Sequence, residues 1–166
     1  MEKALARARV FPLCKALSTQ DNMALIKFKK IWEDDDSMLQ LELTASNGKL
    51  MTTQDFYIYP DDFISFAKKL EIFFPINGEG EVVLEYGSEI ENFYAYVLFK
   101  ATYRNLSELN IEIRTNNNHE NKDYSENAKM AISHFCCGIA NQELNNLGKS
   151  IINWSKNMGQ EFIHEW

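Results

Sequence analysis

The chain has 166 residues, of which 45% are hydrophobic and 25% are charged, and its net charge is −7. These values are typical of one globular domain, which at this length buries roughly 70% of the surface of its unfolded chain. No apolar run approaches the roughly 18 residues that cross a membrane, and the acidic balance disfavours binding to phosphate backbones. We therefore expect neither a membrane nor a nucleic acid among its partners.

Residues 1–22 differ in composition from the rest of the chain. They contain four basic and two acidic residues and no continuous apolar core, so residues 23–166 carry a net charge of −9. We expect a loosely packed or disordered extension at 1–22, with an organellar transit peptide as an alternative. Residues 23–166 are predicted to form a single domain, whose acidity permits a basic protein partner or simply keeps the protein in solution.

The three cysteines are Cys14, Cys136 and Cys137. Their number is odd and two of them are adjacent, which is not the pattern of a disulfide framework. Cysteine usage therefore favours a reducing compartment, and we predict a cytoplasmic location.

The first half of the domain is predicted to begin with three strands, at residues 24–32, 38–45 and 49–59. Apolar and polar side chains alternate along the first two strands, and Asn47-Gly48 is a strong hairpin signal before the third. Between the first two strands, Asp34, Asp35 and Asp36 form a polar turn. This turn resembles part of a calcium loop but lacks its spacing, so we interpret it as a solvated hairpin turn.

A helix is predicted directly after the third strand. Pro60 suits the first helical position, and Asp61 and Asp62 suit the first turn, where the helix dipole favours anions. The apolar residues that follow recur at helical spacing and predict one buried stripe: Phe63, Phe66, Ala67, Leu70 and Phe74.

The middle of the chain predicts three further strands, at residues 81–86, 93–103 and 106–114. The strand at 93–103 has apolar side chains on both faces, so we expect it to be central in a sheet or to lie at an interface. Residues 115–127 are rich in asparagine and charge, which is typical of a mobile loop.

For residues 127–137, a strand and a short helix are both compatible with the pattern, and we favour the strand. A second helix is predicted from Asn141, as its N-cap, to Gly159, before an aromatic tail that ends in Trp166. Within that helix Gly148 is expected to lower stability by about 1 kcal/mol relative to alanine. The sequence thus predicts an α+β domain with two helices and a largely antiparallel sheet of six or seven strands.

Known catalytic motifs are missing from the sequence. It contains no G-x-G-x-x-G, no phosphate-binding loop and no G-x-S-x-G. His134 with Cys136 or Cys137 could supply metal ligands, together with His119 or Asp123, or a nucleophile, but a packed histidine beside buried thiols is the favoured interpretation. We predict no catalytic residue, no cofactor and no metal, and therefore a protein that is not an enzyme.

The order of these elements resembles that of small bacterial immunity proteins of the WapI type, which are cognate to contact-dependent toxins. The resemblance extends roughly from Leu25 to Met158. It depends on the strand-then-helix residues Phe56, Pro60, Phe63, Phe66 and Leu70 and on the closing-helix residues Leu144, Leu147 and Ile151. It implies a cytoplasmic protein that binds a cognate toxin domain, often a nuclease, and occludes its active site. The alternatives are a small-ligand-binding module, with a pocket lined by Tyr94 and Tyr96, and an enzyme of unrecognised type.

An immunity function predicts a surface in which acidic side chains surround aromatic anchors. Glu108 and Glu112 are expected to share the outward face of one strand beside Tyr94 or Tyr96. The other candidate partner-binding residues are acidic side chains of loops and turns: Glu89, Glu91, Asp34, Asp35 and Asp36. The sequence leaves open whether the protein is a monomer or a homodimer.

Overall fold

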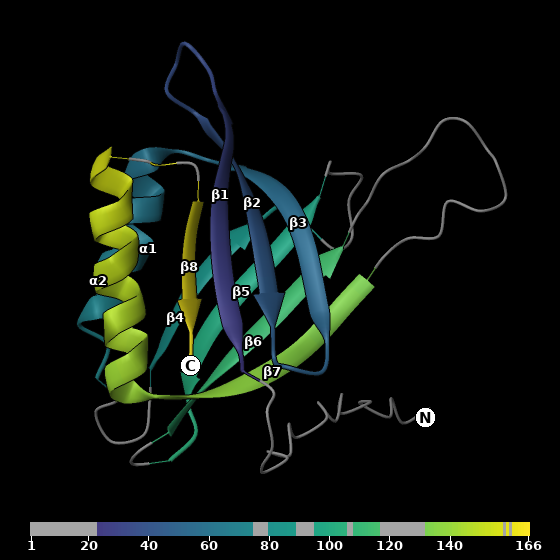
Figure 1. Cartoon of the computed structure of the whole chain (residues 1–166), viewed down its shortest axis with the longest axis vertical. Helices are drawn as coiled ribbons and strands as arrows, with labels where there is room; N and C mark the ends of the chain where they lie inside the picture. Colours follow the sequence, from purple (N-terminus) through teal and green to yellow (C-terminus); the bar gives the residue numbers. More distant parts are fainter. Residues whose placement is uncertain are drawn as a thin grey trace, which may run out of the picture.

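The computed structural model describes residues 23–74, 80–88, 95–105, 108–116, 132–157, 159 and 161–166. The predicted extension at 1–22, most of the predicted loop at 115–127 and residues 127–131 lie outside this part of the chain. Within it, eight strands form two four-stranded antiparallel sheets accompanied by two helices (Figure 1). The predicted α+β class, the antiparallel pairing and the positions of both helices are confirmed.

The first sheet has the order β3-β2-β1-β8 and the second the order β4-β5-β6-β7. The strands of the first sheet are β1 (Leu25–Glu33), β2 (Leu39–Ser46), β3 (Met51–Ile58) and β8 (Glu161–Glu165). Those of the second are β4 (Glu81–Tyr86), β5 (Tyr96–Tyr103), β6 (Glu108–Asn116) and β7 (Ile132–Ala140). The region expected to be either strand or short helix is therefore a strand.

The sequence predicted one sheet of six or seven strands, and the additional strand is β8. This strand replaces the expected aromatic tail and pairs antiparallel with β1. Backbone hydrogen bonds of 3.1 Å in both directions between Ala24 and Trp166 extend the ladder by one pair. The C-terminal residues thus complete the first sheet, in a strand too short for its period to be recognised.

The helices are α1 (Pro60–Glu71) and α2 (Asn141–Asn157), which lie side by side along one end of the sheets (Figure 1). Four members of the predicted stripe of α1 are buried, but Phe74 is 72% exposed because the helix ends at Glu71. Phe73 is buried instead. The predicted capping by Asn141 is also wrong, since its Oδ1 has no hydrogen-bond partner in the described chain.

The contact between the two helices depends on Gly148. A Cβ atom at this position would lie 2.4 Å from the backbone nitrogen of Glu71 and 2.6 Å from the carbonyl oxygen of Ala67. One helical turn earlier, Asn145 Nδ2 donates to the carbonyl oxygens of Leu70 (2.8 Å) and Phe73 (3.1 Å). Both carbonyls are at or just beyond the C-terminal end of α1, where intrahelical donors are lacking, and that of Leu70 also accepts a 3.3 Å bond from the backbone nitrogen of Phe73, so α2 helps to cap α1.

Strand β5 lies between β4 and β6, as its doubly apolar pattern predicted. Val97 and Phe99 belong to the core between the sheets, whereas Tyr96 and Leu98 are buried on the opposite face. A buried hydrogen bond of 2.7 Å between the hydroxyls of Thr52 and Thr115 joins the two sheets.

Polar side chains of the first sheet also bond to the backbone of β7. Asn47 Nδ2 donates to the carbonyl oxygen of Cys136 at 3.2 Å, and Trp166 Nε1 donates to that of Gly138 at 2.8 Å. These bonds hold β7, the last strand in its order, against the first sheet.

The two adjacent cysteines have different environments. Cys137 faces the core, and burial raises the pKa of its thiol to about 12, which makes it a poor nucleophile. Cys136 is disulfide-bonded, contrary to the expectation from the cysteine count. Cysteine usage therefore does not support the predicted cytoplasmic location, which stays a prediction. Neither described helix is long and apolar enough to cross a membrane.

Candidate partner-binding surface

Glu112, one of the two favoured acidic residues, is already paired within the second sheet. Its Oε1 lies 2.7 Å from Arg114 Nε, 2.6 Å from Arg114 Nη2 and 2.9 Å from His134 Nε2. Burial raises the pKa of Glu112, but the hydrogen bond and charge of Arg114, and then those of His134, outweigh it and keep the pKa below its usual value. This carboxylate is therefore a cross-strand link, and a lysine in its place would face two basic groups.

The strand register also separates the favoured acidic residues from Tyr96. Tyr96 is opposite Asn116, whereas Glu112 is opposite Lys100, four residues further along β5 and about 13 Å away. Glu108 lies beyond the other end of that ladder, 3.6 Å from Arg104 Nη1. The structure does not bring these two glutamates together with Tyr96. Tyr94, Glu89 and Glu91 lie outside the described residues.

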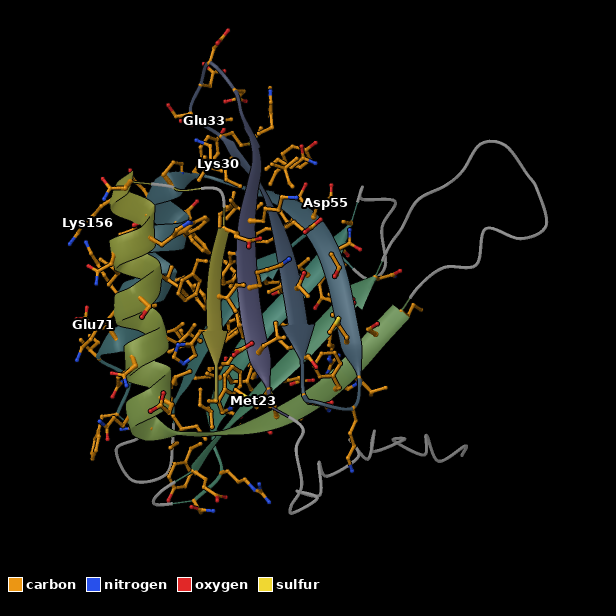
Figure 2. The ribbon with its side chains drawn as sticks, viewed as in Figure 1. Met23, Lys30, Glu33, Asp55, Glu71 and Lys156 are labelled. Atoms are coloured by element: carbon orange, nitrogen blue, oxygen red, sulfur yellow. The ribbon has the colours of Figure 1, made fainter. Side chains whose placement is uncertain are left out.

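The acidic turn at residues 34–36 is at the tip of the β1–β2 hairpin, which projects beyond the rest of the fold (Figure 1). The turn is ordered by Asp34, whose Oδ1 accepts a 2.7 Å hydrogen bond from the backbone of Met38. Asp35 and Asp36 are exposed. Figure 2 shows that Lys30 and Glu33, which form an ion pair, lie below the tip.

A groove lies between α1, β4 and the turn end of this hairpin, where Met38 precedes β2. Its volume is about 610 Å³. The lining comes from all three elements and from the end of β3: Met38, Tyr57, Ile58, Tyr59, Asp62, Ser65, Phe66, Lys69, Val83, Leu84, Glu85 and Tyr86. The groove therefore combines residues that are distant in the sequence.

Three tyrosines line one part of the groove. Tyr59 is 53% exposed, and the rings of Tyr57 and Tyr86 have centroids 6.3 Å apart. Burial raises the pKa of Tyr86, and the nearby Tyr57 and Asp55 raise it further, so this hydroxyl stays protonated at neutral pH. Tyrosines in such a place provide a large contact area and a polar end, which is typical of binding surfaces.

The charged residues of the lining differ in whether they have hydrogen-bond or ion-pair partners. Glu85 accepts a 3.0 Å hydrogen bond from the Tyr96 hydroxyl, which fixes its carboxylate at the rim. Asp62 and Lys69 are exposed and have no ion-pair partner in the described chain. Asp55, labelled on β3 in Figure 2, accepts a 2.7 Å hydrogen bond from Gln40 and adds negative charge behind the tyrosines.

The side chains considered as metal ligands do not form a site within the described chain. None of its histidine, cysteine and acidic residues form a group of three that could hold a metal ion. His134 is exposed and bonds to Glu112, so the expected packed histidine is wrong, whereas Cys137 is buried as expected. His119 and Asp123 lie outside the described residues.

Sequence patterns explain Asp61 and Asp62 by the start of a helix and residues 56–59 by a strand, and no pattern connects them with Tyr86. Only the packing of α1 beside β4 creates the groove. The small-ligand alternative expected a pocket lined by Tyr94 and Tyr96, but the tyrosines of this groove are Tyr57, Tyr59 and Tyr86; Tyr96 does not line it, and Tyr94 lies outside the described residues.

In comparisons with known proteins, no family model matches the chain, and no curated protein matches it. A chain from a solved structure, the CdiA-CT/CdiI toxin and immunity complex from Enterobacter cloacae, is similar to 76% of this chain over 97% of its own length. Its TM-score is 0.41 and its sequence identity is 11%.

Proposed function

We propose that this protein is an immunity protein, which binds a basic toxin domain, possesses no catalytic activity of its own and blocks the active site of its partner. The observation that carries the proposal is the groove, which presents tyrosines and carboxylates together on a preformed surface. The strand-then-helix resemblance and the charge of −9 on residues 23–166 support it.

The physical reason is complementarity to a cationic surface. A nuclease-type toxin presents positive charge to its phosphate substrate, and an acidic inhibitor is attracted to the same surface. Charge of this kind mainly increases the association rate, whereas desolvated aromatic side chains supply most of the binding free energy. In the groove Asp62 and Glu85 would provide the first effect, and Tyr57 and Tyr59 the second.

The test uses the protein encoded by the neighbouring gene as the partner. We expect it to bind the wild-type protein and to lose its toxic activity on binding. The variant Asp62→Lys should slow association about tenfold at low salt, and the difference should decrease as salt is added.

Asp61→Lys is the matched control. Asp61 and Asp62 both lie in the first turn of α1 and are both exposed, but only Asp62 lines the groove. Both variants change the net charge and the helix dipole interaction equally. Equal rates for the two variants would contradict the groove as the site, and an absence of binding by the wild-type protein would contradict the immunity function.

A second candidate function is the binding of a small ligand. The volume of about 610 Å³ is within the range of ligand pockets, and the groove is lined mainly by apolar and aromatic side chains. A small molecule that remains with the purified protein and is released on denaturation, detected by mass spectrometry, would favour this function.

A further inference from the structure

The groove runs along the edge of a strand, not across its face. Residues 83–86 are four consecutive residues of β4, and all four line the groove. Successive side chains of a strand point to opposite faces, so consecutive residues share a groove only where it follows the backbone edge. Residues 57–59, where β3 ends and α1 begins, also line the groove consecutively.

This edge of β4 has no strand beside it in the described chain. β4 is the first strand in its order and pairs only with β5 there. Apart from this ladder with β5, no hydrogen bond from a described residue reaches the backbone of residues 83–86. The opposite end of the same sheet differs, since Asn47 and Trp166 bond to the backbone of β7.

We propose that the edge of β4 binds an extended, cationic segment of the partner protein as an added antiparallel or parallel strand. This mode gives affinity through backbone hydrogen bonds and specificity through alternate side chains. This proposal rests on the immunity function for the identity of the partner, which would be the toxin. The cationic, extended character of the bound segment does not depend on that function.

Charge and aromatic content identify the occupant as cationic. Glu85 and Asp62 lie on the two sides of the groove, on β4 and α1. Lysine or arginine side chains of an added strand would approach these carboxylates and the faces of Tyr57 and Tyr59, which attract cations. Lys69 is a basic residue of the lining and would disfavour a positive charge at its own position.

A second copy of this chain is a poorer occupant. If two β4 strands paired antiparallel about Val83, Glu81 of one copy would be opposite Glu85 of the other. Like charges directly opposite each other on neighbouring strands are destabilising. The acidic sequence of β4 therefore favours a basic partner over itself.

The test uses the full chain and a synthetic peptide that alternates lysine and valine over six residues, the length of β4. We expect addition of the peptide to slow amide hydrogen exchange in β4 and to leave exchange in β7 unchanged. A peptide that alternates glutamate and valine should bind at least about tenfold more weakly at low salt. A lysine–valine peptide with central prolines should not slow exchange, because proline lacks the amide donor.

Several outcomes would overturn the proposal. The first is unchanged exchange in β4 at about millimolar peptide, a concentration at which even weak binding is detected. The second is slow exchange in β4 without peptide, together with a dimer in sedimentation, which would identify a second copy as the occupant. The third is equal binding of the glutamate peptide, which would contradict a cationic segment.

The peptide experiment and the binding test with the neighbouring gene product together distinguish the strand-docking site from the immunity function. If the peptide binds β4 but the neighbouring gene product does not bind the protein, the strand-docking site stands and the immunity function fails. If that product binds and is inhibited without slower exchange in β4, the immunity function stands and the strand-docking site fails.

Discussion

The two long sides of α1 meet very different surroundings. On one side α2 approaches so closely that Gly148 has no space for a methyl group. On the other side α1 and β4 leave a groove of about 610 Å³. If α1 moved toward β4 to fill the groove, it would lose its contact with α2, because packed interfaces tolerate little displacement. Firm packing on one side of the helix therefore keeps the other side open.

Gly148→Ala should produce the largest change, because the new methyl would collide with the backbone of α1. Overpacking destabilises by about 1–3 kcal/mol, and because the Cβ atom would lie 2.4 Å from a backbone atom we expect the upper part of this range, which exceeds the gain of about 1 kcal/mol in helix propensity. Urea unfolding should show a lower midpoint. Gly159→Ala is the control, since a Cβ atom there meets nothing within 4 Å. A more stable Gly148→Ala protein would contradict the close contact.

Asn145→Ala should have the next largest effect. It removes the hydrogen bonds to the carbonyl oxygens of Leu70 and Phe73, and Leu70 then keeps only the 3.3 Å bond from the backbone nitrogen of Phe73. We expect a loss of about 1–2 kcal/mol in the free energy of unfolding. The neighbouring Asn146→Ala has no such bond in the described chain and should change stability by less than about 0.5 kcal/mol. Similar losses in both variants would show that α2 does not cap α1 in this way.

Acidification should lower the free energy of unfolding through His164, which lies beside Glu143 of α2. Burial lowers the pKa of His164 below its ordinary value of 6.5, although the charge of Glu143, 3.7 Å away, acts in the opposite direction. The unfolded chain therefore takes up a proton first, and stability should be full above about pH 6.5 and decrease as the pH falls toward the folded pKa. Unfolding of the wild-type protein and His164→Gln at about pH 7.5 and 5.5 measures this difference.

Glu112 also affects the pH dependence of stability, but in a lower pH range than His164. Its pKa is lowered in the folded state, so its contribution is present above its ordinary value of 4.5 and is lost only as the pH falls below it. A decrease in stability between about pH 7.5 and 5.5 that persists in His164→Gln would exclude His164 as its source.

Tyr59→Ala should produce the smallest change in stability. The side chain is 53% exposed, and substitutions at exposed positions usually change the free energy of unfolding by less than about 0.5 kcal/mol. The same variant should weaken partner binding, as expected for an aromatic anchor. A large loss of stability would show that the groove side of α1 is packed as firmly as the α2 side.

The sequence predicted those features that local patterns determine. The start of α1 followed from Pro60 and its two aspartates, and the central position of β5 followed from apolar side chains on both of its faces. It did not predict the close contact at Gly148, because helix propensity does not include a neighbouring helix. The expected proximity of Glu112 and Tyr96 is wrong for a similar reason, whereas the location of the binding surface stays a prediction. The strand register separates Glu112 from Tyr96, and only tertiary packing joins Tyr59 to Tyr86.

The hydrogen bonds from Asn47 and Trp166 to β7 have a consequence for assembly. A sheet with two open edges can add strands at both ends and grow into a fibre, whereas a sheet with one closed edge stops after a single addition. Since Asn47 and Trp166 bond to the carbonyl oxygens of Cys136 and Gly138, a further strand at this end would have to break both bonds, which disfavours a second addition there. Complexes formed through the second sheet should therefore have a fixed one-to-one stoichiometry, and the double variant Asn47→Ala with Trp166→Ala should be prone to polymerise.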